Sequence, residues 1–280
     1  AFVYQKTILR GDATSIFKRL VEYKSEAEKS AAFNDKTNCF IQRVDNFDAI
    51  PGIPFAYYLS RNAFEDFKNG IPLKEILNPK QGTSTGDDEY FVRSWFEVNY
   101  VGIGFDYSST ESAHKSKKKY FPLDKGGGYR KWYGDNERII KFDESSYSKL
   151  LGMGNHLPSR QCYFLPGLTW SKIASELSVR YDPAGFVCSS VGLKGFPSDD
   201  EWEYCLAFLN SKVCAYFLGI ISAGISIVSG DIEKMPLIIS KSMQIQIQKI
   251  TEQCISLCKE EWDTYEISWD IRRHPLVYST

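Results

Sequence analysis

The sequence is poor in the residues that build metal and redox sites. It contains only three histidines, His114, His156 and His274, and they lie too far apart in the sequence to have the spacing of metal ligands. No two of its seven cysteines form a C-x-x-C pair, and an odd number of scattered cysteines does not predict a disulfide framework. We therefore expect no metal site, and the cysteine usage favours a reducing cytoplasm.

The motifs of common catalytic and cofactor sites are also missing. The short glycine pairs in "VGIGF" and "LGMGNH" have neither a P-loop lysine nor the spacing of a Rossmann fingerprint. There is no G-x-S-x-G elbow, no H-E-x-x-H segment and no pair of carboxylates that differs from ordinary surface acids. We predict no catalytic residue and no cofactor site in this chain.

Long hydrophobic runs and a strong net charge are absent too. The most apolar stretch, "CAYFLGIISAGISIV", is too short and too interrupted by glycine to span a bilayer, so we expect no membrane association. The formal net charge is −1 and the isoelectric point about 6.4, which argues against a surface that binds polyanions everywhere. Any site for a nucleic acid must then be a local patch.

The 280 residues carry helix and strand patterns that alternate without a βαβ rhythm, and aromatic residues make up 15% of them. This mixture predicts an α+β fold with a mixed β-sheet, peripheral helices and a long C-terminal helix. We expect a strand-like segment over residues 1–11, an amphipathic helix over 15–33 and the long helix within 241–266. The helix face predicted to be apolar in 241–266 contains Ile245, Ile247, Ile250, Cys254, Ile255 and Cys258. The sequence begins without methionine and directly in regular structure, which suggests a piece of a longer protein.

The most basic stretch lies between residues 111 and 141. It has nine lysines and arginines against four acids, and "KKKYFPLDKGGGYRKWYG" interleaves these bases with aromatic residues. Lysine and arginine can neutralise phosphates, glycines expose backbone N–H groups, and aromatic rings can stack on bases. A solvated hairpin whose aromatic residues face the core explains this stretch equally well.

Two further segments have a similar composition. "QGTSTGDDEYFVRSWFEV" places hydroxyl groups and acids before an arginine, and these can hydrogen-bond phosphates or base edges. "PGLTWSKI" followed by "SVRYDP" again combines a hydroxyl group, a tryptophan and bases. Three such segments in a chain without a catalytic motif favour binding over chemistry. We expect the three tryptophans of these segments to be in the core: Trp95, Trp132 and Trp170.

These segments resemble the C-terminal part of PglX-type adenine-specific DNA methyltransferases of BREX phage-defence systems, which are related to type IIG enzymes and type I specificity subunits. The resemblance runs through "IPGIPFAYYLS", "YFPLDKGGGYRKWYG", "RYDPAGFV", "LAFLNSKV", "GDIEKMPL" and "EISWDIRRHPL", and covers most of residues 50–276. It implies that residues 1–48 are the tail of an upstream methyltransferase domain, 49–240 a DNA target recognition domain, and 241–280 a spacer-like helix and tail.

The function implied by the resemblance is sequence-specific recognition of double-stranded DNA for a methyltransferase domain of the same polypeptide in restriction-modification or BREX defence. The chain lacks the S-adenosylmethionine loop and the [N/D]-P-P-[Y/F] segment that such an enzyme needs, so it is not expected to methylate DNA alone. The cofactor S-adenosylmethionine is expected only for the full-length parent. Arginines are the expected base readers, because a guanidinium can bond guanine O6 and N7 together. The residues predicted to contact DNA are Thr85, Arg93, Lys125, Gly127, Tyr129, Arg130, Lys131, Ser171, Lys172 and Arg180.

Three alternatives remain open. The acidic segment from Glu252 to Asp270 would suit a docking surface for other defence-complex subunits or for a phage inhibitor. A nuclease-linked enzyme piece would need a carboxylate cluster for a metal, which the sequence does not display. A binder of single-stranded nucleic acid would rely on stacking more than on groove contacts.

Overall fold

The computed structural model describes residues 13–198, 201–222, 224, 226–272 and 275–277. The chain divides by compactness into two units, Ala1–Gly70 and Ile71–Thr280, and each is considered by itself. The resemblance predicts a domain boundary between residues 48 and 49 instead. Compact packing and functional organisation are different properties, so the predicted domain boundaries remain predictions.

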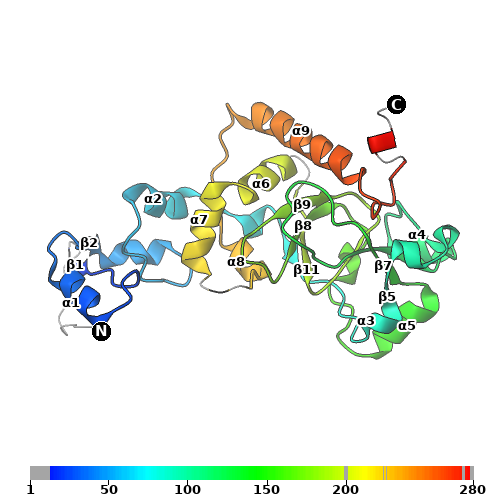
Figure 1. Cartoon of the computed structure of the whole chain (residues 1–280), viewed down its shortest axis with the longest axis horizontal. Coiled ribbons are helices and arrows are strands. Elements are labelled where there is room, and N and C mark those ends of the chain that lie inside the picture. Colours follow the sequence, from blue (N-terminus) through cyan, green and yellow to red (C-terminus); the bar gives the residue numbers. More distant parts are fainter. Residues whose placement is uncertain (1–12, 199–200, 223, 225, 273–274, 278–280) are drawn as a thin grey trace. The chain divides into compact units, whose positions relative to one another are not determined.

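The first unit contains an antiparallel ribbon of two strands, β1 (Thr14–Phe17) and β2 (Phe40–Arg43), with the helices α1 (Glu26–Asn34) and α2 (Arg61–Asn69) (Figure 1). A 3₁₀ turn at Val44–Ala49 places the buried Phe47 in edge-to-face contact with Phe17, at a centroid distance of 5.6 Å.

The helix predicted over residues 15–33 is wrong in its first half. Residues 14–17 form β1, and α1 begins only after Ser25. Ser25 accepts a hydrogen bond from the Glu28 backbone N–H, and the Glu28 carboxylate accepts one from the Ser25 N–H, so a capping box fixes the helix start. Ile16 and Phe17 instead pair with β2, as β-branched and aromatic residues favour. The strand predicted over 1–11 lies outside the described residues.

The second unit contains two four-stranded sheets. The first sheet has the order β10-β6-β7-β5, and the second has the order β4-β11-β8-β9. Only β10 and β6 pair in parallel within these sheets, so the first sheet is mixed. Strands β12 and β3 form a separate two-stranded antiparallel sheet. The strands are β3 (Ile71–Pro72), β4 (Pro79–Lys80), β5 (Val92–Ser94), β6 (Tyr120–Asp124), β7 (Arg138–Lys141), β8 (Gly167–Ser171), β9 (Val179–Asp182), β10 (Val187–Cys188), β11 (Gly192–Gly195) and β12 (Pro236–Leu237).

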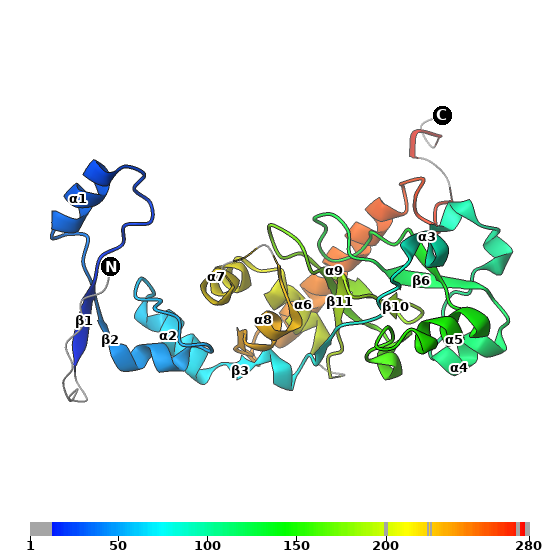
Figure 2. The same ribbon diagram turned by 90° about the horizontal axis from the view of Figure 1, so that it is seen from below.

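Helices flank these sheets. Figures 1 and 2 both place α3, α4 and α5 beside the first sheet, and α6 runs next to the second sheet and to α9. The helices of this unit are α3 (Asp88–Phe91), α4 (Thr110–Lys115), α5 (Glu144–Gly152), α6 (Trp202–Leu209), α7 (Lys212–Ile221), α8 (Ser229–Glu233) and α9 (Gln244–Trp262). Short 3₁₀ turns occur at Leu73–Glu75, Trp95–Glu97, Tyr100–Gly102, Arg160–Cys162 and Pro275–Val277. The predicted α+β class, with a mixed sheet and a C-terminal helix, is confirmed.

The main core of the second unit is rich in aromatic rings. Phe121 of β6 meets Phe164 edge-to-face at 5.6 Å, and Phe142 meets Tyr163 at 5.9 Å, all four being buried. Part of the high aromatic content is therefore explained by packing. Trp170 is fully buried in β8 as expected, whereas Trp95 and Trp132 are only half-buried.

The C-terminal helix α9 packs on α6, but not through the whole predicted face. Its buried side includes Thr251, whose hydroxyl donates to the Glu203 carbonyl at 3.3 Å, and Trp262. Ile245 and Ile250 are exposed instead, because a helix turns about 100° per residue and they point away from Thr251. The predicted single apolar face is therefore wrong for these two isoleucines.

Among the described residues, no single helix has both the length and the apolar composition to cross a membrane. Helices α6 and α7 reach that composition only together, as a pair bent by 69°.

Candidate functional site

Residues 120–141 of the basic stretch form a hairpin of β6 and β7 joined by a long loop, whereas its first part lies in α4 and the turn that follows. The two strands pair antiparallel, with Tyr120 opposite Lys141 and Pro122 opposite Ile139. Residues 125–137, here called the basic loop, connect them and carry Gly126, Gly127 and Gly128 near the start. The second half of the stretch that sequence composition marks as basic and aromatic is therefore one continuous loop with its flanking strands, and Lys115, Lys117, Lys118 and Lys119 precede it.

The second sheet holds the basic loop at several points. The Ser171 hydroxyl donates to the Gly127 carbonyl at 3.0 Å, which fixes the start of the loop. The Trp132 N–H donates to the Val179 carbonyl at 2.9 Å, and the Tyr181 N–H donates to the Trp132 carbonyl at 2.8 Å. The loop thus continues the hydrogen bonding of β9 for a short distance.

Arg180 and Asp135 form a buried ion pair under this loop. Arg180 is 2% exposed, and its guanidinium lies 3.2 Å from the Asp135 carboxylate. Burial raises the pKa of Asp135, and the nearby positive charges of Arg180 and Arg130 oppose that rise. Ser171 is also buried. In this conformation Arg180 and Ser171, both predicted to contact DNA, hold the loop from inside the protein.

Arg130 connects the loop to α9. Its Nε donates to the Tyr133 carbonyl at 2.8 Å, its guanidinium pairs with the Glu261 carboxylate, and its centre lies 5.0 Å from the Trp262 ring. Such stacking of a guanidinium on an indole is a favourable cation–π contact. The Arg130 guanidinium, which was predicted to read bases, is thus bound by groups of the chain itself. Whether it also contacts DNA stays a prediction.

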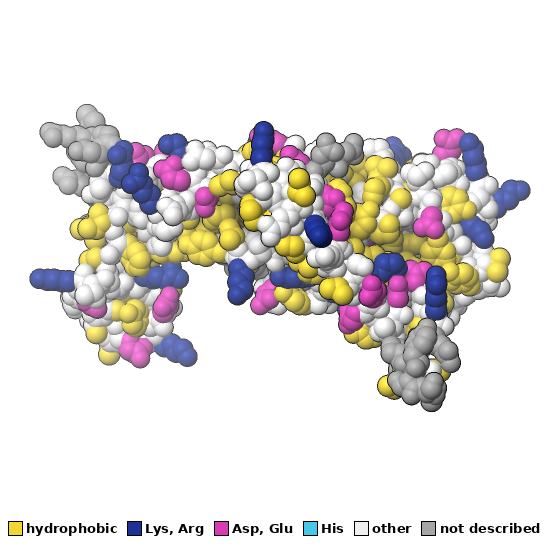
Figure 3. Space-filling view, turned by 90° about the horizontal axis from the view of Figure 1, so that it is seen from above, with side chains coloured by type: hydrophobic (Ala, Val, Ile, Leu, Met, Phe, Trp, Pro, Cys, Tyr) yellow, Lys and Arg dark blue, Asp and Glu magenta, His cyan; other side chains and the backbone are white. Residues whose placement is uncertain are grey.

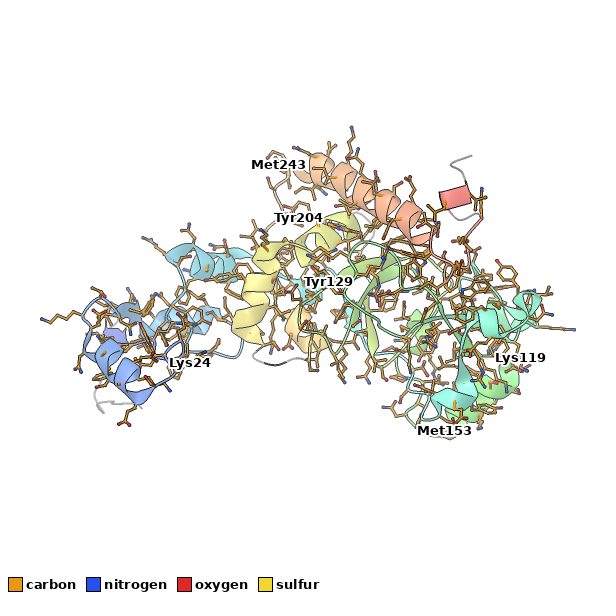
Figure 4. The ribbon with its side chains drawn as sticks, viewed as in Figure 1. Lys24, Lys119, Tyr129, Met153, Tyr204 and Met243 are labelled. Carbon is orange, nitrogen blue, oxygen red and sulfur yellow. The ribbon has the colours of Figure 1, made fainter. Side chains whose placement is uncertain are left out.

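The tip of the basic loop presents Gly127, Gly128 and Tyr129 to solvent. Tyr129 is 62% exposed, and its ring lies 5.8 Å from the Lys131 ammonium. Lys131 itself donates to the Asn210 carbonyl at the end of α6, at 2.8 Å. Figure 4 shows Tyr129 on the side of this unit where α7 lies, well away from Lys119 near α4.

The hydroxyl-rich segment before β5 is tied to the start of the basic loop. The Thr85 hydroxyl donates to the Asp88 carboxylate, whose other oxygen lies 2.6 Å from the Lys125 ammonium. Burial opposes ionisation of Asp88, but the hydrogen bonds from Lys125 and Thr85 outweigh it and hold the pKa of that carboxyl below its usual value. The structure therefore brings together two segments that are about forty residues apart in sequence.

Two predicted contact residues lie apart from this cluster. The Arg93 guanidinium donates to backbone carbonyls of its own segment, those of Glu89 and Val92. Lys172 follows β8, and its backbone bonds to Val191 and Ile227 while its side chain is half-buried. The structure joins Thr85, Lys125, Gly127, Tyr129, Arg130, Lys131, Ser171 and Arg180 around the basic loop, but not Arg93 or Lys172.

Sequence reasoning missed a buried ion cluster that joins the two sheets. The Lys194 ammonium on β11 lies 3.3 Å from the Asp124 carboxylate at the end of β6 and 3.2 Å from that of Asp182 on β9. Burial raises the pKa of Asp124, and repulsion from Asp182 adds to the rise. Burial opposes the charge on Lys194, but the two carboxylates raise its pKa nonetheless. The signal was available as a lysine inside the short apolar run "VGLKGF".

A second basic cluster lies beside the first sheet. The ammonium groups of Lys141 and Lys149 lie 4.0 and 3.6 Å from the centre of the Tyr90 ring, and Lys141 donates to the Tyr90 hydroxyl at 2.9 Å. This hydrogen bond is the main cause of the lowered pKa of Tyr90. Among the described residues, no carboxylate forms an ion pair with either lysine. Lys149 was not singled out from the sequence.

A search for three or more His, Cys, Asp or Glu side chains that could hold a metal ion found no group within the described part of the chain. Cys254 and Cys258 lie one turn apart on the half-buried side of α9. The chemistry available around the basic loop is therefore that of lysine, hydroxyl, backbone and aromatic groups, which suits binding to an anionic, planar ligand.

Comparisons with known proteins found two relatives along nearly the whole chain, and no protein-family model matched. The adenine-specific methyltransferase PglX of Lacticaseibacillus casei is 34% identical over 99% of this chain, which spans 24% of that protein. The adenine-specific methyltransferase BrxX of Escherichia coli is 29% identical over 94% of this chain, which spans 21% of that protein. The chain thus corresponds to a region of less than a quarter of the length of these relatives.

Proposed function

We propose that this chain is the region of an adenine-specific DNA methyltransferase that recognises double-stranded DNA in a sequence-specific manner. Its main support is one observation, the basic loop, which is held in place from inside and presents Gly127, Gly128 and Tyr129 beside lysines. The two relatives, both called adenine-specific methyltransferases, make DNA the most reasonable polyanion for such a loop.

The proposal assigns methylation itself to the rest of the polypeptide. The sequence contains neither a glycine-rich S-adenosylmethionine loop nor an [N/D]-P-P-[Y/F] segment, so its residues do not fit that cofactor. In the parent protein, a role in BREX-type phage defence would follow from the relatives. Within this chain, residues 49–240 would recognise DNA, 1–48 would belong to the methyltransferase domain, and 241–280 would act as a spacer.

Two lysines near the loop tip, Lys131 of the loop and Lys212 at the start of α7, would position the duplex through its phosphates. Both lysines line a groove that Tyr129 also lines, and among the described residues no carboxylate forms an ion pair with either. Each phosphate that a lysine neutralises releases a counterion, which gives affinity but no sequence preference. The bases would be read by other groups of the same surface.

The test is fluorescence anisotropy of the whole chain with a labelled pool of random duplexes at two salt concentrations. We expect Lys131→Ala and Lys212→Ala to weaken binding to all sequences alike and to lower the dependence on salt, by about one unit of slope for each lost phosphate contact. Lys249→Ala, on the exposed side of α9, is the matched control and should bind like the parent. Unchanged binding of both groove variants would contradict this placement of the interface.

A second candidate function is docking of another protein on α9. Met243, Ile250 and Leu257 are spaced by seven residues on this helix and are all exposed, so they form an apolar stripe without a partner among the described residues. Figure 3, seen from the side on which α9 lies in Figure 1, shows apolar side chains with single basic and acidic groups between them. A chain that binds no duplex but captures another part of the parent polypeptide, independently of salt, would favour this alternative.

A further inference from the structure

A groove of about 430 Å³ lies beside the tip of the basic loop. Its wall includes Leu177, Leu218 and Ile227, which are largely buried, and Tyr129, Lys131 and Lys212 also line it. The volume falls within the range of small-ligand sites. An apolar wall with an exposed aromatic ring suits a planar, uncharged ring, and the two cations suit negative groups that flank it.

Tyr129 is held in place at this groove by the backbone on both sides. The Gly127 carbonyl accepts from Ser171, and the Arg130 N–H donates to the Ser178 hydroxyl at 3.2 Å. Only Gly128 and Tyr129 lie between these two anchors. A ring on such a short, fixed segment can meet a ligand with little further loss of backbone entropy.

The exposure of Tyr129 distinguishes it from the other aromatic residues of the loop. Tyr133 is buried, and its carbonyl accepts a hydrogen bond from Arg130. Trp132 is half-buried, and its backbone hydrogen-bonds Val179 and Tyr181 of the second sheet. Tyr129 keeps more than half of its surface in water, with the Lys131 ammonium near its ring. Of the three aromatic residues of the loop, Tyr129 therefore has the most exposed ring for stacking.

We propose that the groove receives one unpaired nucleobase of the bound DNA, with that base stacked on the Tyr129 ring. This inference rests on the proposed function and specifies which part of the DNA the loop tip holds. The base would cover the apolar wall near Leu177 and Leu218, and its flanking phosphates would lie within reach of Lys131 and Lys212. Among the described residues that line the groove, one acid, Glu176, is present beside these two lysines, so their charge favours an anion.

The charge and the ring contribute differently to such a site. Lysine contacts to phosphate act on paired and unpaired DNA alike, because both have the same backbone. Stacking on Tyr129 requires an accessible base face, which a base inside an intact duplex does not offer. The chain should therefore prefer a duplex that already contains an unpaired base, and Tyr129 should be the origin of that preference.

The experiment compares binding of the whole chain to two otherwise identical duplexes, one fully paired and one with a single bulged adenine. We expect the parent to bind the bulged duplex more tightly. Tyr129→Ala should lose about fivefold to 150-fold of affinity for the bulged duplex and much less for the paired one. Tyr129→Phe should retain the preference, because it keeps the ring. Phe96→Ala is the control, since Phe96 is similarly exposed but contacts Trp95 rather than a lysine.

The outcomes separate this inference from the proposed function. A parent that binds both duplexes equally, or a Tyr129→Ala variant that keeps the preference, overturns the stacking site while DNA binding stands. A Tyr129→Phe variant as weak as Tyr129→Ala also overturns it, because the hydroxyl and not the ring would then carry the contact. A parent that binds neither duplex at low salt overturns the proposed function itself.

Discussion

At the scale of single residues, two arginines of the candidate site have their guanidinium groups engaged inside the protein. Arg180 is paired with Asp135 under the basic loop, and Arg130 lies between Glu261 and the Trp262 ring. In the sequence, each of these arginines resembles a base reader. The acidic partners that engage them come from segments far away in the chain, so the sequence does not reveal them. At the loop, Tyr129 keeps an exposed ring, while Lys125 is paired with Asp88 and Lys131 donates to the Asn210 carbonyl.

Arg130→Ala is expected to destabilise the fold rather than only to reduce DNA binding. The substitution removes the cation–π contact with Trp262, the pair with Glu261 and the hydrogen bond to the Tyr133 carbonyl. The Arg130 side chain is mostly buried although Glu261 is half-exposed, so we expect a loss of about 1–3 kcal/mol in the free energy of unfolding, mainly from the contacts with Trp262 and the Tyr133 carbonyl. Urea denaturation of the two proteins measures it, with Lys131→Ala as the comparison. Equal stability together with lost DNA binding would instead return Arg130 to the role of a base reader.

Asp124 should make the stability of the protein depend on pH. Its pKa is raised above the ordinary value of 3.8 by burial and by Asp182, so the folded state keeps a proton that the unfolded chain has already released. The stabilisation by this proton is fully present below the pKa of Asp124 in the unfolded chain. It is lost as pH rises from about 4 towards the pKa of Asp124 in the folded protein.

The variant Asp124→Asn tests this dependence, because it removes the titrating group from the buried cluster. The free energy of unfolding of the variant minus that of the parent should increase from pH 4 to pH 8, because the parent loses stability over this range and the variant does not. Urea denaturation across that range measures the difference, in which the titration of other carboxyl groups largely cancels. A difference that stays constant with pH would show that Asp124 titrates normally.

At the scale of elements, the geometry of the basic loop depends on its glycines. Gly127 has φ +151°, and an added Cβ would lie 2.5 Å from the Asp135 carboxylate, which is the partner of Arg180. The neighbouring Gly128 has no other atom within 4 Å of the position of its Cβ. The two residues are adjacent in the same loop and form a matched pair for mutation.

Gly127→Ala should destabilise the protein by about 1–3 kcal/mol and weaken duplex binding, because the new methyl group displaces Asp135 and strains the backbone. Gly128→Ala should change both properties little. Thermal unfolding and anisotropy on the same samples measure the two effects. Similar behaviour of the two variants would show that the loop has no fixed conformation to disturb.

Elements were predictable from sequence where local signals agree with packing. The hairpin and the long C-terminal helix both appear where strand and helix patterns are strong. The helix expected over 15–33 failed because Ile16 and Phe17 pair with β2, a contact that the local pattern does not contain. The face of α9 was mispredicted because apolar residues occur around more of the helix than α6 covers, leaving Ile245 and Ile250 exposed.

The residues of the candidate site were predictable by type but not by role. Composition identified the loop that contains Tyr129, Arg130 and Lys131. It could not distinguish the exposed ring from the buried guanidinium, because burial is set by β9 and α9, about 50 and 130 residues further along the chain. The cluster around Lys194 was hidden for a related reason, because its carboxylate partners come from two other strands.

At the scale of the whole molecule, the chain is nearly neutral, with 34 basic and 35 acidic residues. A protein of this charge is not attracted to DNA by its total field, so contact must be made through local groups such as those around the basic loop. The chain also spans less than a quarter of the length of its two relatives. We therefore propose DNA recognition for this chain and methylation for the rest of the parent polypeptide.

Selection from a random duplex library, followed by sequencing, decides whether this chain recognises a particular DNA sequence. The immobilised chain is offered the library at moderate salt, and retained duplexes are amplified through several rounds. We expect one short motif to be enriched, and we expect Gly127→Ala to reduce its enrichment whereas Gly128→Ala does not. Retention without any enriched motif, or no retention even at low salt, would contradict sequence-specific recognition by this chain.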